Sequence, residues 1–173
     1  MFYDNTLILS AAQAITVTAA STNIYDVTGA GSGTAPNQTF GTATVFGADI
    51  GIGDGAAIPT AYFNVGTAFV SGGGATLTIA VQAAPDNGSN APGTYETITA
   101  TQAFVAADLI AGAQIVLPIP PTATLGTLKP RFYRFNYTVA TSTFSAGTIT
   151  GSILLNPATG IYSIQYPNNF TSV

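Results

Sequence analysis

The chain has 173 residues, of which 6% are charged and 47% hydrophobic, and its formal net charge is −4 without any Cys or His. An ordinary soluble domain has about a quarter charged residues, so we favour a protein that hides much of its surface in an assembly. The missing residue types exclude disulfides, thiolate nucleophiles and imidazole acid–base catalysis. The acidic balance argues against nucleic acid as a partner, and no apolar run is long enough for a membrane-spanning helix.

The first third of the chain predicts short extended segments between polar or glycine-rich loops. Residues 3–9 are expected to be extended, as an arm, and residues 14–18 to form a strand. Residues 29–37 have the low complexity of a loop, and 42–50 are a further strand candidate. A glycine-rich stretch over 47–59 follows and carries two aspartates.

The strand pattern becomes stronger from residue 62 onward. Residues 62–70 and 77–81 alternate apolar and polar side chains, and Asp86-Asn87-Gly88 is a turn signal because Asn and Gly accept positive φ at little cost. Residues 106–111 predict a single helical turn stopped by Gly112. Further β-prone segments are expected at 95–101, 102–105 and 114–118.

The densest aromatic and β-branched segment runs from Arg131 to Leu155, and we take it as the centre of the core. Its first half places Tyr133, Phe135 and Tyr137 on one face, and its second half places Ile149, Gly151 and Ile153 on one face. The connector over 140–146 is short and mostly polar. The pattern therefore predicts two strands joined as an antiparallel hairpin.

These segments add up to roughly eight to ten short strands with turn signals between them and no sustained helical period. The predicted fold class is all-β, a jelly roll or antiparallel β-sandwich. We expect one domain over residues 1–156, with an extended N-terminal segment, and a C-terminal extension over 157–173 that could act as an arm.

The carboxylates in the sequence form no convincing metal site or catalytic pair. Asp49 and Asp54 could hold Ca²⁺ on their glycine-rich loop, but the spacing is not that of an EF-hand and no third carboxylate follows, so a solvated loop is favoured. A glycosidase pair would need two carboxylates across a cleft, and only Glu96 and scattered Asp residues are available. We therefore expect no enzyme activity, no cofactor and no metal site.

Two groups of residues are candidates for a partner interface. All three cations, Lys129, Arg131 and Arg134, lie at the start of the 131–155 segment. They could pair with local carboxylates or dock on an acidic partner surface, and the sequence leaves both open. In the tail, aromatic residues are unusual for a disordered segment, so ordering on the domain or on a partner is expected; these residues are Tyr162, Tyr166 and Phe170.

The N-terminal part of the chain contains a fairly specific pattern: Leu7 to Thr16, then Ala20-Ser21-Thr22-Asn23 and Asp26. This pattern resembles the capsid cement proteins of certain tailed, mostly short-tailed, bacteriophages. The likeness covers most of residues 5–156, and its later parts are Phe63-Asn64-Val65, Phe69, Gly74 to Thr78, Leu109 to Gly112, Leu117 to Pro120, Arg131 to Tyr137 and Ala146 to Ile149. The stretch between about Gly29 and Pro59 and the tail after Asn156 are longer than the family pattern.

The resemblance implies a jelly-roll structural protein on the outer surface of the virion capsid. Such a decoration protein would bridge neighbouring subunits of the major capsid protein without catalysis, and would act as a homo-oligomer such as a dimer. The alternative is a carbohydrate-binding jelly-roll module on a virion or cell surface, using exposed Tyr residues as stacking platforms. The absence of Trp weakens that alternative.

Overall fold

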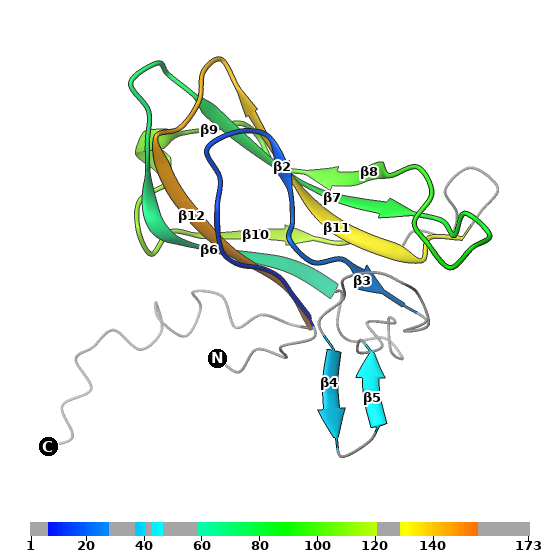
Figure 1. The fold of residues 1–173 in the computed structure, drawn as a ribbon. Coiled ribbons are helices and arrows are strands. Elements are labelled where there is room, and N and C mark those ends of the chain that lie inside the picture. The colour runs from blue at the N-terminus through cyan, green and yellow to red at the C-terminus, as the bar shows by residue number, and fades with distance from the viewer. Residues whose placement is uncertain (1–6, 28–36, 41–42, 47–58, 121–128, 156–173) are drawn as a thin grey trace, which may run out of the picture.

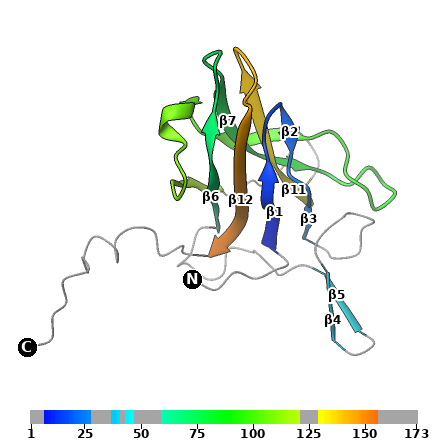
Figure 2. The ribbon, with the colours of Figure 1, turned by 60° about the vertical axis from the view of Figure 1, so that its left-hand side comes forward.

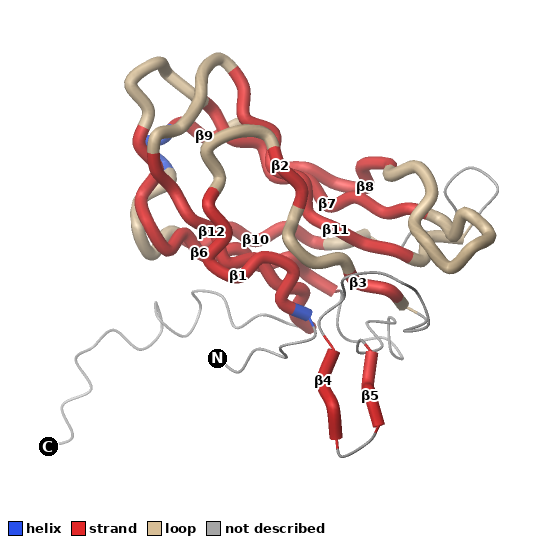
Figure 3. Tube along the Cα trace, in the orientation of Figure 1, coloured by secondary structure: helices blue, strands red, loops and turns tan. Residues whose placement is uncertain are grey.

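Two antiparallel β-sheets pack face to face in the computed structural model, which describes residues 7–27, 37–40, 43–46, 59–120 and 129–155. Figures 1 and 2 show the two layers from views 60° apart, and Figure 3 shows that strands make up most of the described chain. The predicted all-β class and antiparallel sandwich are confirmed.

The first sheet has four strands in the order β1-β12-β6-β10. Its strands are β1 (Ile8–Ala14), β12 (Ala146–Leu155), β6 (Pro59–Val70) and β10 (Gln114–Pro118). Its central pair, β12 and β6, is the longest in this sheet, and both strands contribute fully buried residues to the core.

The second sheet has six strands built on the path β2-β11-β7-β8, with β3 also paired to β11 and β9 to β7. Its strands are β2 (Ala19–Ala20), β3 (Tyr25–Asp26), β11 (Phe132–Ala140), β7 (Thr76–Ala84), β8 (Glu96–Ala100) and β9 (Phe104–Val105). A separate two-stranded sheet pairs β4 (Asn37–Phe40) with β5 (Ala43–Phe46).

The predicted hairpin between residues 131 and 155 is wrong, although both strands exist. β11 pairs with β7, β2 and β3, whereas β12 pairs with β1 and β6 in the other sheet. The loop between them therefore crosses from one layer to the other. Both strands bury their apolar faces toward the space between the sheets, and each needs long neighbours of its own, so they face each other instead of sharing a ladder.

The core forms where the inward faces of the two sheets meet. Phe135 and Tyr137 of β11 and Phe63 of β6 are fully buried, and the ring centroids of Phe63 and Phe135 lie 4.6 Å apart in an edge-to-face arrangement. Ile149 and Ile153 of β12 are fully buried opposite them. The faces predicted from the alternation of both strands are thus the faces that pack.

Gly151 allows a close approach between the layers. A Cβ atom there would lie 2.9 Å from Phe63, 3.0 Å from Phe135 and 3.0 Å from the hydroxyl of Tyr137. Real Cβ atoms rarely approach other atoms so closely, so only glycine fits against these three rings. Gly151 thus lies on the same face of β12 as Ile149 and Ile153, as predicted. Its lack of a side chain leaves room for the three rings.

Among the other local predictions, some are confirmed and others are wrong. The 14–18 strand is wrong, because β1 ends at Ala14 and residues 15–18 carry the chain from one sheet to the other, with only Ile15 buried. The 86–88 turn is confirmed, with Gly88 at φ +89°. The helical turn predicted over 106–111 is shorter than expected, because it is a 3-10 turn over Ala106–Asp108 that ends at Leu109, before Gly112. The predicted loops at 29–37 and 47–59 lie outside the described residues except for Asn37 and Pro59, which begin β4 and β6.

The two lateral sides of the sandwich differ in whether the chain connects the edges of the two sheets. On the first side, called the closed side (Ile8–Asp26), the chain runs from β1 in one sheet directly to β2 and β3 in the other (Figure 2). On the second side, called the open side, β10 ends the four-stranded sheet, near β8 at the end of the six-stranded sheet.

Candidate partner interface

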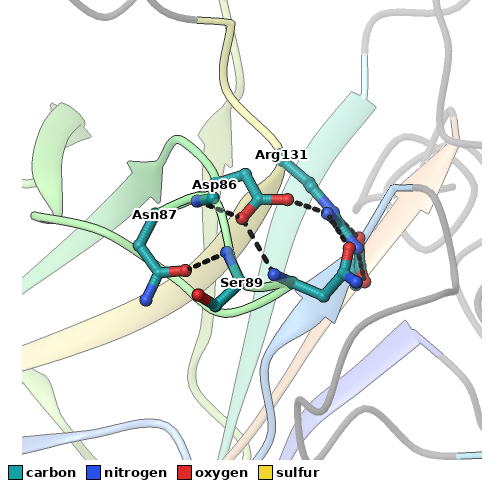
Figure 4. A network of polar contacts seen from close by, with 7 residues as sticks. Asp86, Asn87, Ser89 and Arg131 are labelled. Carbon is teal, nitrogen blue, oxygen red and sulfur yellow. Dashed lines mark hydrogen bonds and ion pairs between the residues drawn. The ribbon is translucent and has the colours of Figure 1, made fainter.

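Arg131 lies at the centre of a polar network at the start of β11 (Figure 4). Its Nε donates to Oδ1 of Asp26 at 2.9 Å and its Nη2 donates to Oδ2 of the same carboxylate at 3.0 Å. Its Nη1 donates to Asn90 Oδ1 at 3.0 Å and also to the carboxylate of Asp86. One guanidinium therefore holds β3, β11 and the 86–90 turn together.

The turn that meets Arg131 organises itself through its own side chains. Asp86 Oδ1 accepts the backbone N–H groups of Gly88 at 2.8 Å and of Asn90 at 3.1 Å, and Asn87 Oδ1 accepts that of Ser89 at 2.8 Å. Such contacts favour the left-handed backbone of Asn90, at φ +57°. The same Asp86 thereby shapes the turn with one oxygen and binds Arg131 with the other.

Arg131 and Asp26 form a largely buried ion pair. The side chains of Arg131 and Asp26 are 12% and 3% exposed. The hydrogen bond to Asp26 raises the pKa of Arg131, desolvation opposes this, and the charges of Asp26 and Asp86 add to the rise. An isolated buried carboxylate would be costly, so Arg131 is committed to this internal role.

The other two cations sit in different surroundings. Arg134 donates from Nε to Gln82 Oε1 at 2.9 Å, and its guanidinium carbon lies 3.7 Å from the ring centroid of Tyr95. Burial raises the pKa of Tyr95, and the charge of Arg134 lowers it by a smaller amount. Lys129 is exposed. The local-pairing alternative thus describes Arg131, while a partner role for Lys129 and Arg134 stays a prediction.

Sequence reasoning missed the partners of Arg131. Asp26 is a buried residue of β3 that pairs with a cation 105 positions later. The available signal in the sequence was the position of Asp26 between the apolar residues Tyr25 and Val27, because a carboxylate that becomes buried requires a cation. The tail candidates Tyr162, Tyr166 and Phe170, like Asp49 and Asp54, lie outside the described residues.

A polar chain inside the closed side explains part of the N-terminal stretch Leu7 to Thr16. The hydroxyl of Tyr137 donates to Ser10 Oγ at 2.8 Å, and Ser10 donates to Gln13 Oε1 at 2.9 Å. Gln13 Nε2 then donates to the carbonyl oxygen of Ala20 at 2.7 Å. These bonds connect β11, β1 and β2, and burial raises the pKa of Tyr137 so that its phenol stays neutral.

Ser21 and Asn23 complete the closure a few residues later. Ser21 Oγ accepts the buried N–H of Phe135 at 3.0 Å and donates to the carbonyl oxygen of Asn23 at 2.8 Å. The backbone N–H of Asn23 donates to the carbonyl of Leu9 at 2.8 Å. The segment that carries the most specific part of the resemblance therefore fastens the edges of both sheets.

A group of uncharged loops lies at the opposite end of the sandwich from Arg131. It is formed by the loops at 16–18, 71–74 and 141–145, which contain no charged residue. Phe144 N donates to Thr16 O at 3.0 Å and Ser145 N to Val70 O at 2.8 Å, so these loops lie together. Val17 and Val70 are exposed here, at 54% and 52%.

Functional groups for metal binding or sugar stacking are few in the described chain. Within it, no group of three or more carboxylates or other metal-ligand types comes together, and no helix has the length and apolarity to cross a membrane. Among the Tyr residues described, Tyr25, Tyr62 and Tyr137 are buried, while Tyr95 and Tyr133 are partly buried.

Together these features define an all-β sandwich whose polar clusters connect distant segments of its own chain. A family model described as Bbp16 matches residues 9–153, which is most of the chain. The chain therefore belongs to the Bbp16 family, and this supports the phage-associated part of the resemblance. No curated protein matches the sequence.

Proposed function

We propose that this protein is a structural virion protein that binds the outside of a phage head and bridges neighbouring subunits of the major capsid protein. The observation that carries the proposal is the Bbp16 match over residues 9–153, which coincides with nearly all of the stretch that resembles capsid cement proteins. The closed side adds support, because residues of the most specific part of that resemblance have a defined structural task there.

The proposed mechanism is thermodynamic. A protein that binds across subunit boundaries of an assembled shell, and not to separated subunits, stabilises the shell by linkage. Many copies with several modest contacts each provide avidity. The partners are the major capsid protein and further copies of this chain, and neither a cofactor nor catalysis enters the mechanism.

The surface chemistry fits a partner that is neither nucleic acid nor a lipid headgroup. Of the three cations, Arg131 is bound by Asp26 and Asp86, which leaves few positive charges for phosphate. The uncharged loop end, with Val17 and Val70 exposed, offers apolar contact area of the kind that assemblies cover.

The carbohydrate-binding alternative gains no specific observation from the described residues. A sugar platform needs an open aromatic face, and the guanidinium of Arg134 already covers one face of Tyr95. Saturable binding to one sugar class on a glycan array would support this alternative.

Cosedimentation with expanded phage heads that lack this protein tests the proposal. We expect stoichiometric binding and a higher temperature of head rupture. A variant carrying Val17→Asp tests the loop end, with Thr138→Asp as a control on the exposed outer face of β11. A protein that stays in the supernatant and leaves the rupture temperature unchanged would contradict the cement role.

A further inference from the structure

The edges of the two sheets differ in how well they are protected against pairing with another strand. Natural sheets protect their edges with bulges, very short strands and charges. β1 has two register shifts and a left-handed Ala12 at φ +45°. The edge strands β2, β3 and β9 have two residues each, and β8 has a register shift and the exposed Glu96.

β10 has fewer of these devices. It runs for five residues in unbroken register with β6, it contains no charged residue, and Val116 at its centre is 39% exposed. Pro118 removes one donor at its end. Among the described strands, none pairs with the outer edge of β10.

The hydrogen-bond pattern shows which groups of β10 face outward. Val65 N donates to Ala113 O at 2.9 Å, and Ile119 N donates to Pro59 O at 2.9 Å. In an antiparallel ladder every second residue bonds the same neighbour, so Ile115 and Leu117 bond β6. Gln114 and Val116 therefore direct their N–H and C=O groups away from the sheet, as Pro118 directs its C=O.

We infer that β10 is the interface with a second copy of this chain, paired antiparallel about a two-fold axis at Val116. In this register each Val116 exchanges both hydrogen bonds with its counterpart, and each Gln114 N–H meets the Pro118 carbonyl of the other copy. The missing donor of Pro118 costs little, since it falls at the end of the ladder. Two four-stranded sheets become one continuous sheet.

We identify the partner strand as a second copy of β10 because the strand is complementary to itself. A two-fold axis sets each residue near its own copy, so a charged strand would repel itself, whereas Gln114 to Pro118 carries no charge. The register centred on Val116 also overlaps the full length of both strands. The inference deepens the proposed self-association and does not depend on binding to a shell.

Sedimentation of the full chain over a range of concentrations tests the interface. The wild type should dimerise, and Val116→Pro, which removes an N–H that β6 does not use, should raise the dimer Kd at least about tenfold with little change in melting temperature. Val116→Glu and Val116→Lys should each be monomeric at pH 7. Their equimolar mixture should restore the dimer, because opposite charges then face each other.

Val27 provides the matched control, because it is 43% exposed and follows β3 on the closed side. Val27→Glu and Val27→Lys should dimerise like the wild type. A monomeric wild type, dimers that persist in the Val116 variants, or a mixture that stays monomeric would each overturn the inference. A monomer that still cosediments with heads would leave the cement proposal intact, and a dimer that fails to bind heads would contradict that proposal alone.

Discussion

The two sides of the sandwich solve the problem of a sheet edge in different ways. On the closed side, Ser10, Gln13 and Ser21 fasten short strands across both layers, and the Arg131–Asp26 pair anchors β3. On the open side, β10 presents a regular backbone edge without a charge. Side-chain hydrogen bonds therefore occupy backbone groups along the first edge, whereas no described strand pairs with the outer edge of β10.

The largest expected effect comes from breaking the anchor of the closed side. Arg131→Met should lower the free energy of unfolding by about 3 kcal/mol, because it leaves the buried carboxylate of Asp26 without its cation. Chemical denaturation of both proteins measures this. Lys129→Met, which removes an exposed cation two residues away, should change stability by less than about 0.5 kcal/mol. Equal effects of the two changes would contradict the assigned role of Arg131.

The second largest loss of stability is expected from a change in the contact between the two sheets, which belongs to neither side alone. Gly151→Ala should cost about 2 kcal/mol, because the added methyl group meets Phe63, Phe135 and Tyr137 at or below 3.0 Å. Gly72→Ala is the control, since nothing lies within 4 Å of a Cβ there. A Gly151→Ala variant as stable as the Gly72→Ala variant would show that the layers are less tightly packed.

A smaller loss is expected from a single hydrogen bond of the closed side. Ser21→Ala should cost about 1.5 kcal/mol, because the buried N–H of Phe135 loses its acceptor. Thr16→Ala, at an exposed position between β1 and β2 on the same closed side, should be nearly neutral. Thermal unfolding separates the two, and an unaffected Ser21 variant would mean that the Phe135 N–H finds another partner.

Alkaline pH should weaken the closed side through Tyr137. Burial raises the pKa of its phenol in the folded state, so the unfolded chain releases this proton first as the pH passes about 10. The stabilising contribution is complete below that pH and declines above it, by at most about 1.4 kcal/mol per pH unit. Tyr137→Phe should flatten the decline between pH 9 and 11. An identical slope in both proteins would contradict this assignment.

The sequence predicted the features that depend on local pattern. Alternation identified the buried faces of β11 and β12, and Asn-Gly chemistry identified the 86–88 turn. It failed where the partner of a strand decides the outcome. The 131–155 segment has the local pattern of a hairpin, and only the long apolar neighbours β6 and β7 determine that its strands enter different sheets.

The candidate site was predicted less completely than the fold. The cations were found together, but the Asp26–Arg131 pair spans 105 positions, and no local pattern encodes such a distance. Likewise, Ala11-Ala12-Gln13 has no strong strand propensity, yet it lies in β1 because β12 offers a ladder and Ala12 adopts a left-handed bulge. The open edge of β10 became visible only from its register with β6.

Residue-resolved hydrogen exchange, measured on dilute and on concentrated protein, tests the contrast between the two sides most directly. We expect the Phe135 amide to exchange slowly at both concentrations, and the amides of Gln114 and Val116 to exchange fast in dilute protein and slowly in concentrated protein. Ile115 and Leu117, bonded to β6, should be slow in both. A Val116 amide with the same exchange rate at both concentrations, whether fast or slow, would contradict an edge reserved for a second copy.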